Sequence, residues 1–337
     1  MHETEIAALL AAITAARPQS KQRRTLIEGL LEHVVALAEQ DPDTLDLKIA
    51  ETALSELVEA FEVFAPYRSV MKVTIFGSAR TKVSDPLYQL ARNFGDAIAR
   101  QGWMVVTGAG PGIMAAGMEG AGREHSFGVN IRLPHEQGAN EFIASDVKLV
   151  EMRYFFTRKV ALTKESKAFV AFPGGFGTLD EIFELLTLLQ NGKATPAPVV
   201  LMDTPDGSFW RGLLNFVDEH VATPGYISQF DESLFSMATS PDEAVSAIED
   251  FYRNYHSMRM VGATAVLRMK RAPSVEQLES VNKSFGHLSL DGRIEIIEPT
   301  DPERATHDEI ELARIALQFD RRSYGELRAL INHINTW

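Results

Sequence analysis

The feature that most constrains the fold of this chain is a series of short apolar segments that alternate with helical ones. The apolar segments are 71–76, 103–107, 127–132, 168–172 and 198–202, with a sixth candidate at 234–238. The helical segments between them are 86–100, 112–123, 152–166, 179–191 and 209–221. Strands that are apolar on both sides and alternate with helices pack into a parallel sheet covered on both faces. We therefore predict an α/β fold with a doubly wound parallel sheet.

The segments on either side of this series follow other patterns. Before it, 4–16, 21–39 and 44–64 carry apolar side chains at helical spacing and no catalytic cluster, which favours a helical cap or a dimerisation element. After it come strand-like segments at 263–268 and 293–297, mixed with helical segments at 274–284, 307–319 and 323–334. We predict an N-terminal helical extension over 1–66, a Rossmann-like domain over 67–257 and a small C-terminal α+β extension over 258–337.

Composition argues against several classes of function. The net charge of -13 and the pI near 5.2 argue against general binding to the phosphate backbone of a nucleic acid. There is no cysteine, and the histidines show no metal-ligand spacing, so we expect neither a thiolate site nor a metal site. The N-terminal residues lack the basic start of a secretory signal, and no apolar run is long enough to span a bilayer. These observations predict a soluble cytoplasmic protein without a membrane partner.

Three turns rich in glycine follow predicted strands. The first contains Gly77 and Ser78, the second contains Gly108, Gly110 and Gly112, and the third runs from Pro173 to Glu181. The carboxyl ends of parallel strands share one edge of the sheet, where ligands bind in open α/β folds, so we expect the three turns to lie together. The second turn lacks the GxGxxG spacing of a dinucleotide site, and the Walker pattern GxxxxGK[ST] is absent.

The third turn has the properties of a phosphate site. Gly174, Gly175, Gly177 and Thr178 come between an apolar strand and a helical segment. Backbone N–H groups at such a helix start favour an anion, and glycine lets the backbone approach a phosphate closely. Glu181 has two interpretations: with Thr178 as N-cap it completes a capping box, and at a ligand edge it is a catalytic carboxylate. Spacing alone does not separate the two, and both roles are compatible.

A pair of adjacent cations precedes the third turn. Arg158 and Lys159 lie in the middle of the predicted helix 152–166 of an acidic protein. They could close on a bound anion, with Arg158 as a bidentate fork and Lys159 as a point charge. The alternative is an exposed pair whose positive charges balance those of Glu151 and Glu165.

In combination and in this order, the motifs resemble those of the LOG ("lonely guy") family. The segment Pro173-Gly174-Gly175-Phe176-Gly177-Thr178-Leu179-Asp180-Glu181 matches the family signature PGGxGTxxE, and Arg158-Lys159 matches the Arg-Lys pair upstream of it. The turns at 76–80 and 107–114 also resemble turns of the family. The resemblance covers roughly residues 70–240, and the combination of motifs is highly specific.

The resemblance implies hydrolysis of the N-glycosidic bond of a nucleoside 5′-monophosphate, either AMP or a cytokinin riboside monophosphate, to free base and ribose 5-phosphate. It implies Arg158 and Glu181 as the catalytic pair. It implies substrate contacts by Lys159, the 174–178 turn and Glu136, which alone would be interpreted as a loop residue. No cofactor is required for this hydrolysis. Family members are usually dimeric, with helices of both subunits at the site, so we expect a homodimer or a higher homo-oligomer.

This chain departs from the short plant-type members of the family. It has about 66 residues before the predicted Rossmann-like domain and nearly 80 after it, and its segment from Met152 to Arg158 is longer than the compact Met-His-x-Arg-Lys. It looks like the longer bacterial branch, so the preferred base stays open among adenine, guanine, pyrimidines and cytokinins. A non-catalytic carrier of a nucleotide or phosphate ligand is compatible with the same fold. The presence of both Arg158 and Glu181 favours the enzyme over the carrier.

Overall fold

The computed structural model describes residues 3–16, 21–132 and 138–337, and the chain divides into two compact units, Met1–Val58 and Glu59–Trp337. The first unit contains α1 (Glu3–Ala16), α2 (Lys21–Glu39) and most of α3 (Thr44–Phe64), which continues into the second unit. These are the three helices predicted for the N-terminal extension. Within the described ranges, no helix combines the length and the apolar character that a membrane crossing requires.

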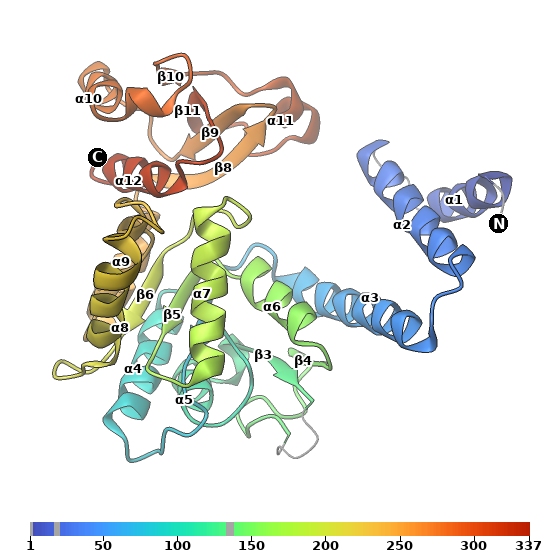
Figure 1. The fold of residues 1–337 in the computed structure, drawn as a ribbon, viewed down its shortest axis with the longest axis horizontal. Coiled ribbons are helices and arrows are strands. Elements are labelled where there is room, and N and C mark those ends of the chain that lie inside the picture. Colours follow the sequence, from blue (N-terminus) through green and yellow to red (C-terminus); the bar gives the residue numbers. More distant parts are fainter. Residues whose placement is uncertain (1–2, 17–20, 133–137) are drawn as a thin grey trace. The chain divides into compact units, whose positions relative to one another are not determined.

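The second unit is built around a seven-stranded parallel sheet (Figure 1). Its strands are β1 (Lys72–Phe76), β2 (Met104–Thr107), β3 (Ser126–Ile131), β4 (Leu149–Met152), β5 (Ala168–Ala171), β6 (Val199–Met202) and β7 (Ser236–Ala238). Their order across the sheet is β4-β3-β2-β1-β5-β6-β7, and each neighbouring pair is parallel. The chain therefore winds outward from β1 to β4 and then, in the opposite direction, from β5 to β7. This topology confirms the predicted doubly wound α/β fold.

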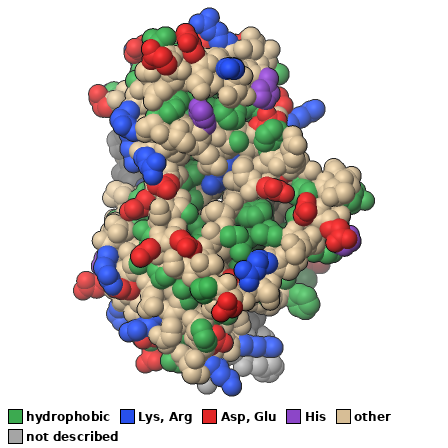
Figure 2. Space-filling model, turned by 90° about the vertical axis from the view of Figure 1, so that its left-hand side faces the viewer, with side chains coloured by type: hydrophobic (Ala, Val, Ile, Leu, Met, Phe, Trp, Pro, Cys, Tyr) green, Lys and Arg blue, Asp and Glu red, His purple; other side chains and the backbone are tan. Residues whose placement is uncertain are grey.

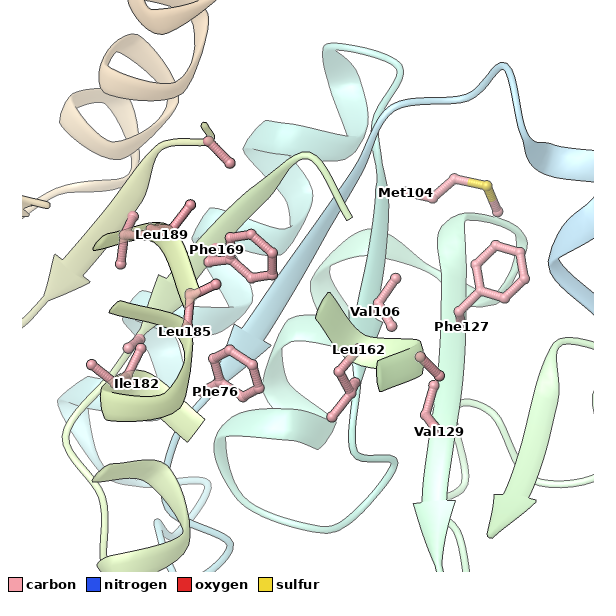
Figure 3. Packing of buried hydrophobic residues seen from close by; sticks show 14 of the residues in the cluster. Phe76, Met104, Val106, Phe127, Val129, Leu162, Phe169, Ile182, Leu185 and Leu189 are labelled. Carbon is pink, nitrogen blue, oxygen red and sulfur yellow. The ribbon is translucent and has the colours of Figure 1, made fainter. Parts of the chain in front are cut away.

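Helices cover both faces of this sheet. One face packs against α4 (Pro86–Arg100), α5 (Ile113–Ala121) and α9 (Pro241–Phe251). The other packs against the end of α3, α6 (Phe155–Lys164), α7 (Phe176–Gln190) and α8 (Phe209–Val217). Figure 3 shows Leu162 of α6 and Ile182 of α7 in the same apolar cluster as Phe76 and Phe169 of the strands. Each such buried side chain stabilises the packing by roughly 1.5–3 kcal/mol, which holds α6 and α7 in place over the sheet.

The segment before α6 differs from the prediction. The helix predicted over 152–166 begins at Phe155, and residues 149–152 form β4, a strand that was not predicted. β4 pairs with β3 at the edge of the sheet, and its side chains alternate between half-buried and buried positions. The central strands were predicted from their continuous apolar runs, and this short alternating segment has no such run.

A second sheet, which is antiparallel, follows the parallel one in the chain and has the strand order β10-β11-β9-β8. This part contains β8 (Tyr255–Val261), β9 (Thr264–Met269), α10 (Val275–Phe285), β10 (Glu295–Ile296), α11 (Asp301–Thr306), β11 (Ala313–Gln318) and α12 (Tyr324–Ile334). The C-terminal part thus contains both helices and strands, as predicted for an α+β extension. One element was predicted wrongly, because the segment predicted as helix 307–319 contains β11, which pairs with β9.

Buried charges explain this difference. A capping box formed by Thr300 and Glu303 starts α11 at Asp301, well before the predicted helix. The carboxylate of Glu303 is fully buried and accepts hydrogen bonds from the Nε atoms of Arg268 at 2.8 Å and of Arg314 at 3.3 Å. Arg268 and Arg314 face each other on the paired strands β9 and β11. A carboxylate shared across two strands depends on tertiary contacts that apolar spacing along the chain does not show.

Charged side chains of both signs are mixed on the surface. On the face that Figure 2 shows, acidic and basic side chains are interspersed, and hydrophobic side chains lie between them. Surface ion pairs include Arg92 with Glu119 at 2.8 Å and Arg132 with Glu151 at 2.9 Å. This mixed pattern differs from the single-sign basic patch that is typical of proteins that bind a nucleic-acid backbone.

Candidate functional site

A cavity of about 720 Å³ opens at the carboxyl edge of the parallel sheet. It lies where the strand order reverses, because β1 and β5 are neighbours in the sheet but far apart in the chain. Most of the predicted site residues line it: Gly77, Ser78, Gly108, Gly110, Arg158, Gly174, Gly175, Gly177, Thr178 and Glu181. Gly112 and Lys159 are not among the lining residues, and Glu136 lies outside the described residues.

Backbone hydrogen bonds hold the three glycine turns together. The N–H of Ser78 donates to the carbonyl of Pro173 at 3.2 Å, and the N–H of Ile113 donates to the carbonyl of Ser78 at 3.0 Å. The first turn thus links the third turn to the start of α5, directly after the second turn. Gly77 is part of this packing, because a Cβ there would lie 2.5 Å from Cγ2 of Ile113. The structure therefore brings all three turns to one edge.

Gly112 has a structural role at this junction. Its φ of +67° lies in the left-handed region, which residues with a side chain rarely adopt. A Cβ at this position would also lie 2.3 Å from the carbonyl oxygen of Ser78, a backbone atom that cannot rotate away. Glycine at this position therefore lets the second turn approach the first.

We expect Gly112→Ala to lower the free energy of unfolding by about 3 kcal/mol, of which about 1–2 kcal/mol comes from the left-handed backbone and the rest from the contact with Ser78. Gly102→Ala is the matched control, because Gly102 has a φ of +81° but nothing within 4 Å of an added Cβ. Urea unfolding of both variants measures the difference. Equal losses would contradict the importance of the close approach.

Helix α7 begins at Phe176, with Gly175 as its N-cap and no side-chain cap. The predicted capping box is therefore wrong, since Thr178 lies inside the first turn and Glu181 in the second. The reason is the extended backbone of Gly175 (φ -87°, ψ -161°), after which the helix starts at once. The backbone N–H groups of Phe176, Gly177 and Thr178 lie in the first turn, where an α-helix offers no acceptor and favours an anion.

Glu181 is a largely buried carboxylate next to a lysine. Its side chain is 11% exposed, and one of its oxygens lies 3.7 Å from Nζ of Lys159. Burial raises the pKa of Glu181, and the charges of Lys159 and Arg158 offset only part of this rise. A buried carboxylate with a raised pKa in a cleft is typical of a group that exchanges protons during a reaction.

Lys159 is surrounded by carboxylates of α7. Its Nζ lies 2.9 Å from Oδ2 of Asp180 and also donates a hydrogen bond to Glu184. Burial is the largest single influence and lowers the pKa of Lys159, but the hydrogen bonds to Glu184 and Asp180 outweigh it, so that the pKa is raised overall. The ammonium group is therefore charged and held next to Glu181.

Arg158, the other member of the cation pair, lines the cavity. Its Nε donates to the carbonyl of Val129 at 2.9 Å. Gly108 makes room for the guanidinium group, because a Cβ there would lie 1.9 Å from Nη2 of Arg158. The alternative of an exposed pair next to Glu151 and Glu165 is wrong for Lys159, whose side chain is 12% exposed and pairs with Asp180 and Glu184 instead.

Asn140 supports the site and was not predicted. Its Nδ2 donates to the carbonyl oxygens of Ala109 at 3.0 Å and of Gly110 at 2.9 Å, which fixes the second turn. This support matters because Ala109 has a φ of +60°, which is unusual for a residue with a Cβ. Asn140 belongs to no motif, so the sequence carried no signal for it. Asn130 also lines the cavity. The sequence did offer a signal for this residue, because it is an amide within a largely apolar predicted strand.

The cavity thus combines a helix start that favours an anion, a carboxylate with a raised pKa and a guanidinium group. Such a site can bind a phosphate ester at α7 and transfer a proton at a bond nearby. Throughout residues 3–16, 21–132 and 138–337, no group of three His, Cys, Asp or Glu side chains is arranged to hold a metal ion.

Comparison with known proteins adds to this description. The model of a protein family described as "possible lysine decarboxylase" matches residues 111–248, a stretch that includes Arg158 and Glu181. The chain is 31% identical to a cytokinin riboside 5′-monophosphate phosphoribohydrolase of Mycobacterium marinum, over 48% of this chain and 84% of that protein. It is also 31% identical to a probable enzyme of the same name from Oryza sativa subsp. japonica, over 52% of this chain and 80% of that protein.

Other matches are shorter or more distant. A phosphoribohydrolase of the same name from Arabidopsis thaliana is 31% identical over 35% of this chain, and the match covers 54% of that protein, about half of its length. Among solved structures, the molybdenum cofactor carrier protein of Chlamydomonas reinhardtii is 21% identical, with a TM-score of 0.39, over 53% of this chain and 96% of that one.

Proposed function

Because the chain belongs to the LOG family, we propose that it hydrolyses the N-glycosidic bond of a nucleoside 5′-monophosphate to the free base and ribose 5-phosphate. The observation that carries this proposal is that Glu181, Arg158 and the glycine turn at the start of α7 line one cavity. The names of the Mycobacterium and Oryza relatives support the same reaction. We propose AMP or a cytokinin riboside monophosphate as the substrate.

In this proposal the 5′-phosphate binds at the first turn of α7. The N–H groups of Phe176, Gly177 and Thr178 donate to its oxygens, and the helix dipole favours its charge. Glu181 lies five residues beyond Phe176, roughly 7.5 Å along the helix axis, and helical side chains lean back toward the N-terminus. Binding of the phosphate therefore positions the anomeric carbon of the ribose near the Glu181 carboxylate.

Hydrolysis passes through an oxocarbenium-like transition state at the anomeric carbon. Glu181 accepts a proton from the attacking water, whose oxygen forms the new bond to that carbon, and its charge stabilises the developing cation. The C–N bond breaks, and its electron pair moves to the base. Arg158 stabilises the negative charge that develops there, and the departing base then takes up a proton.

Lys159 keeps Glu181 ionised in this proposal, and its removal is expected to change the pH dependence. Glu181 must be ionised to accept a proton, so kcat/KM falls as the pH drops through its pKa. In Lys159→Met the cation that lowers this pKa is lost, and the pKa rises further. We expect the acid limb of the kcat/KM profile to move to higher pH.

Two variants control this measurement. Lys159→Arg keeps the charge and is expected to restore the acid limb. Lys164→Met removes an exposed lysine of the same helix, which pairs with Glu165, and is expected to leave the profile unchanged. An unchanged acid limb in Lys159→Met would contradict the proposed effect of Lys159 on Glu181.

We also propose that the protein acts as a homodimer. Four apolar side chains on the neighbouring helices α6 and α7 are about half exposed: Phe155, Phe156, Val160 and Phe183. Exposed apolar side chains gathered on adjacent elements are typical of a protein–protein interface. Sedimentation equilibrium tests this proposal, which a monomer at micromolar concentration would contradict.

A panel of nucleotides tests the proposed reaction. The purified protein is incubated with AMP, GMP, CMP, UMP and N6-isopentenyl-AMP, and the products are separated by chromatography. We expect free base and ribose 5-phosphate from at least one nucleotide. Return of all nucleotides intact, with tight binding, would favour the non-catalytic carrier instead.

A further inference from the structure

Asn130 is a largely buried amide at the cavity. It lies near the end of β3, is 8% exposed and lines the cavity. Its side chain makes no hydrogen bond to any residue that the structure describes. Asn335, which is 6% exposed, instead accepts from the N–H groups of Asn254 and Tyr255 and donates to the carbonyl of Phe251. The donor and the acceptor of this amide are therefore available at the cavity, which suits Asn130 to a ligand.

The strand order places Asn130 far from the phosphate turn. The strands β5, β1, β2 and β3 are successive neighbours, and all four contribute residues at or just after their carboxyl ends to the cavity. Three strand spacings separate β5 from β3, or roughly 14 Å at about 4.8 Å each. With the phosphate bound after β5, Asn130 is at the opposite end of the cavity, where the base of an extended nucleotide lies. Ile131 and Phe155 provide apolar lining at that end.

We propose that Asn130 recognises the base and selects adenine, an inference that rests on the proposed function. A carboxamide carries one donor and one acceptor side by side. Its Nδ2 can donate to N7 of adenine while its Oδ1 accepts from the 6-amino group, a pairing that a 6-oxo purine does not complete. The bond to N7 also stabilises the electron pair that moves onto the base as the C–N bond breaks.

The test removes each side of this contact separately. The substrates are AMP and purine riboside 5′-monophosphate, which lacks the 6-amino group, and the enzymes are wild type and Asn130→Leu. In wild type we expect kcat/KM for AMP to exceed that for the analogue by roughly 10- to 100-fold. In Asn130→Leu we expect this ratio to fall to within roughly threefold of one, because the amino group has lost its partner. Asn130→Asp keeps the shape and the polarity but loses the donor, and it is expected to lower the AMP rate as well.

A purely structural role for Asn130 predicts another result. Asn130→Leu would then lower kcat/KM for both nucleotides by the same factor, leave their ratio unchanged and so overturn the inference. Dissociation constants from calorimetry for the same four combinations give a readout that does not need turnover. If wild type releases no base from any nucleotide, the proposed reaction fails. The ratio of the dissociation constants for AMP and for the analogue then still shows whether Asn130 contacts the 6-amino group of the base.

Discussion

Glu181→Gln is expected to lower kcat for base release by roughly 10²- to 10⁴-fold and to leave the dissociation constant for AMP nearly unchanged. The glutamine keeps the size and the hydrogen-bonding oxygen of the side chain, but it can neither accept the proton of the attacking water nor carry a charge toward the oxocarbenium-like ribose. The proposed phosphate contacts come from backbone N–H groups at the start of α7, which the substitution leaves in place. Rates of base release and calorimetric AMP binding measure the two effects.

The same variant also tests the revised start of α7. Since Glu181 does not belong to a capping box, its replacement removes no cap. Because the pKa of Glu181 is raised, the folded protein binds the proton of this side chain more tightly than the unfolded chain does. The resulting stabilisation of the fold is complete below the usual glutamate pKa and is lost as the pH rises through the raised pKa. At pH values above this raised pKa the wild type has lost that contribution, so Glu181→Gln is expected to be at least as stable there.

Glu184→Gln is the matched control for Glu181→Gln. Glu184 also contacts Lys159, but it is 39% exposed and does not line the cavity. We expect its substitution to change kcat by less than roughly tenfold, because Asp180 and Glu181 still hold the ammonium group. An equal loss in both variants would show that charge around Lys159, and not Glu181 itself, supports the reaction.

Gly174→Ala is expected to raise KM for AMP by roughly 100-fold, because a displacement of about 1 Å in a binding turn can cost this much. A Cβ at Gly174 would lie 2.1 Å from Oγ1 of Thr178 and 3.0 Å from the backbone N of Ser78. Both contacts lie in the turns that form the proposed phosphate site, so the turns must separate to admit the methyl group. KM for AMP and the inhibition constant of ribose 5-phosphate report the loss of phosphate binding.

Gly177→Ala provides the comparison for Gly174→Ala. Gly177 lies in the first turn of the same helix, and nothing lies within 4 Å of an added Cβ. The variant keeps its backbone N–H, and alanine favours the helix by about 1 kcal/mol. We expect KM close to the wild-type value. A large rise in KM for Gly177→Ala, or none for Gly174→Ala, would contradict the account of this turn.

Much of the fold could be predicted from the sequence because the central strands are buried on both faces. Such strands are continuous apolar runs, as in Ala168–Ala171 and Val199–Met202, and they stand out between helices. The strands that were missed or misassigned lack this signal. The edge strand β4 alternates, and β11 carries Arg314, whose burial depends on Glu303 from another element.

The site was predictable where it depends on local chain geometry and not where it depends on packing between helices. The glycine turns are local, and the three of them meet at the edge that a parallel sheet dictates. The contacts of Lys159 with Asp180 and Glu184 require α6 to lie beside α7, which no spacing shows. Thr178 matched a capping pattern, but the helix starts earlier, directly after the extended backbone of Gly175.

Turnover of AMP tests whether the cavity breaks the N-glycosidic bond of a bound nucleotide. The protein is incubated with a large excess of AMP, and chromatography follows AMP, adenine and ribose 5-phosphate over time. We expect equal amounts of adenine and ribose 5-phosphate over many turnovers, with AMP returned intact by Glu181→Gln. Tight binding of AMP by the wild type, with no adenine released from AMP or from any other nucleoside monophosphate, would contradict it.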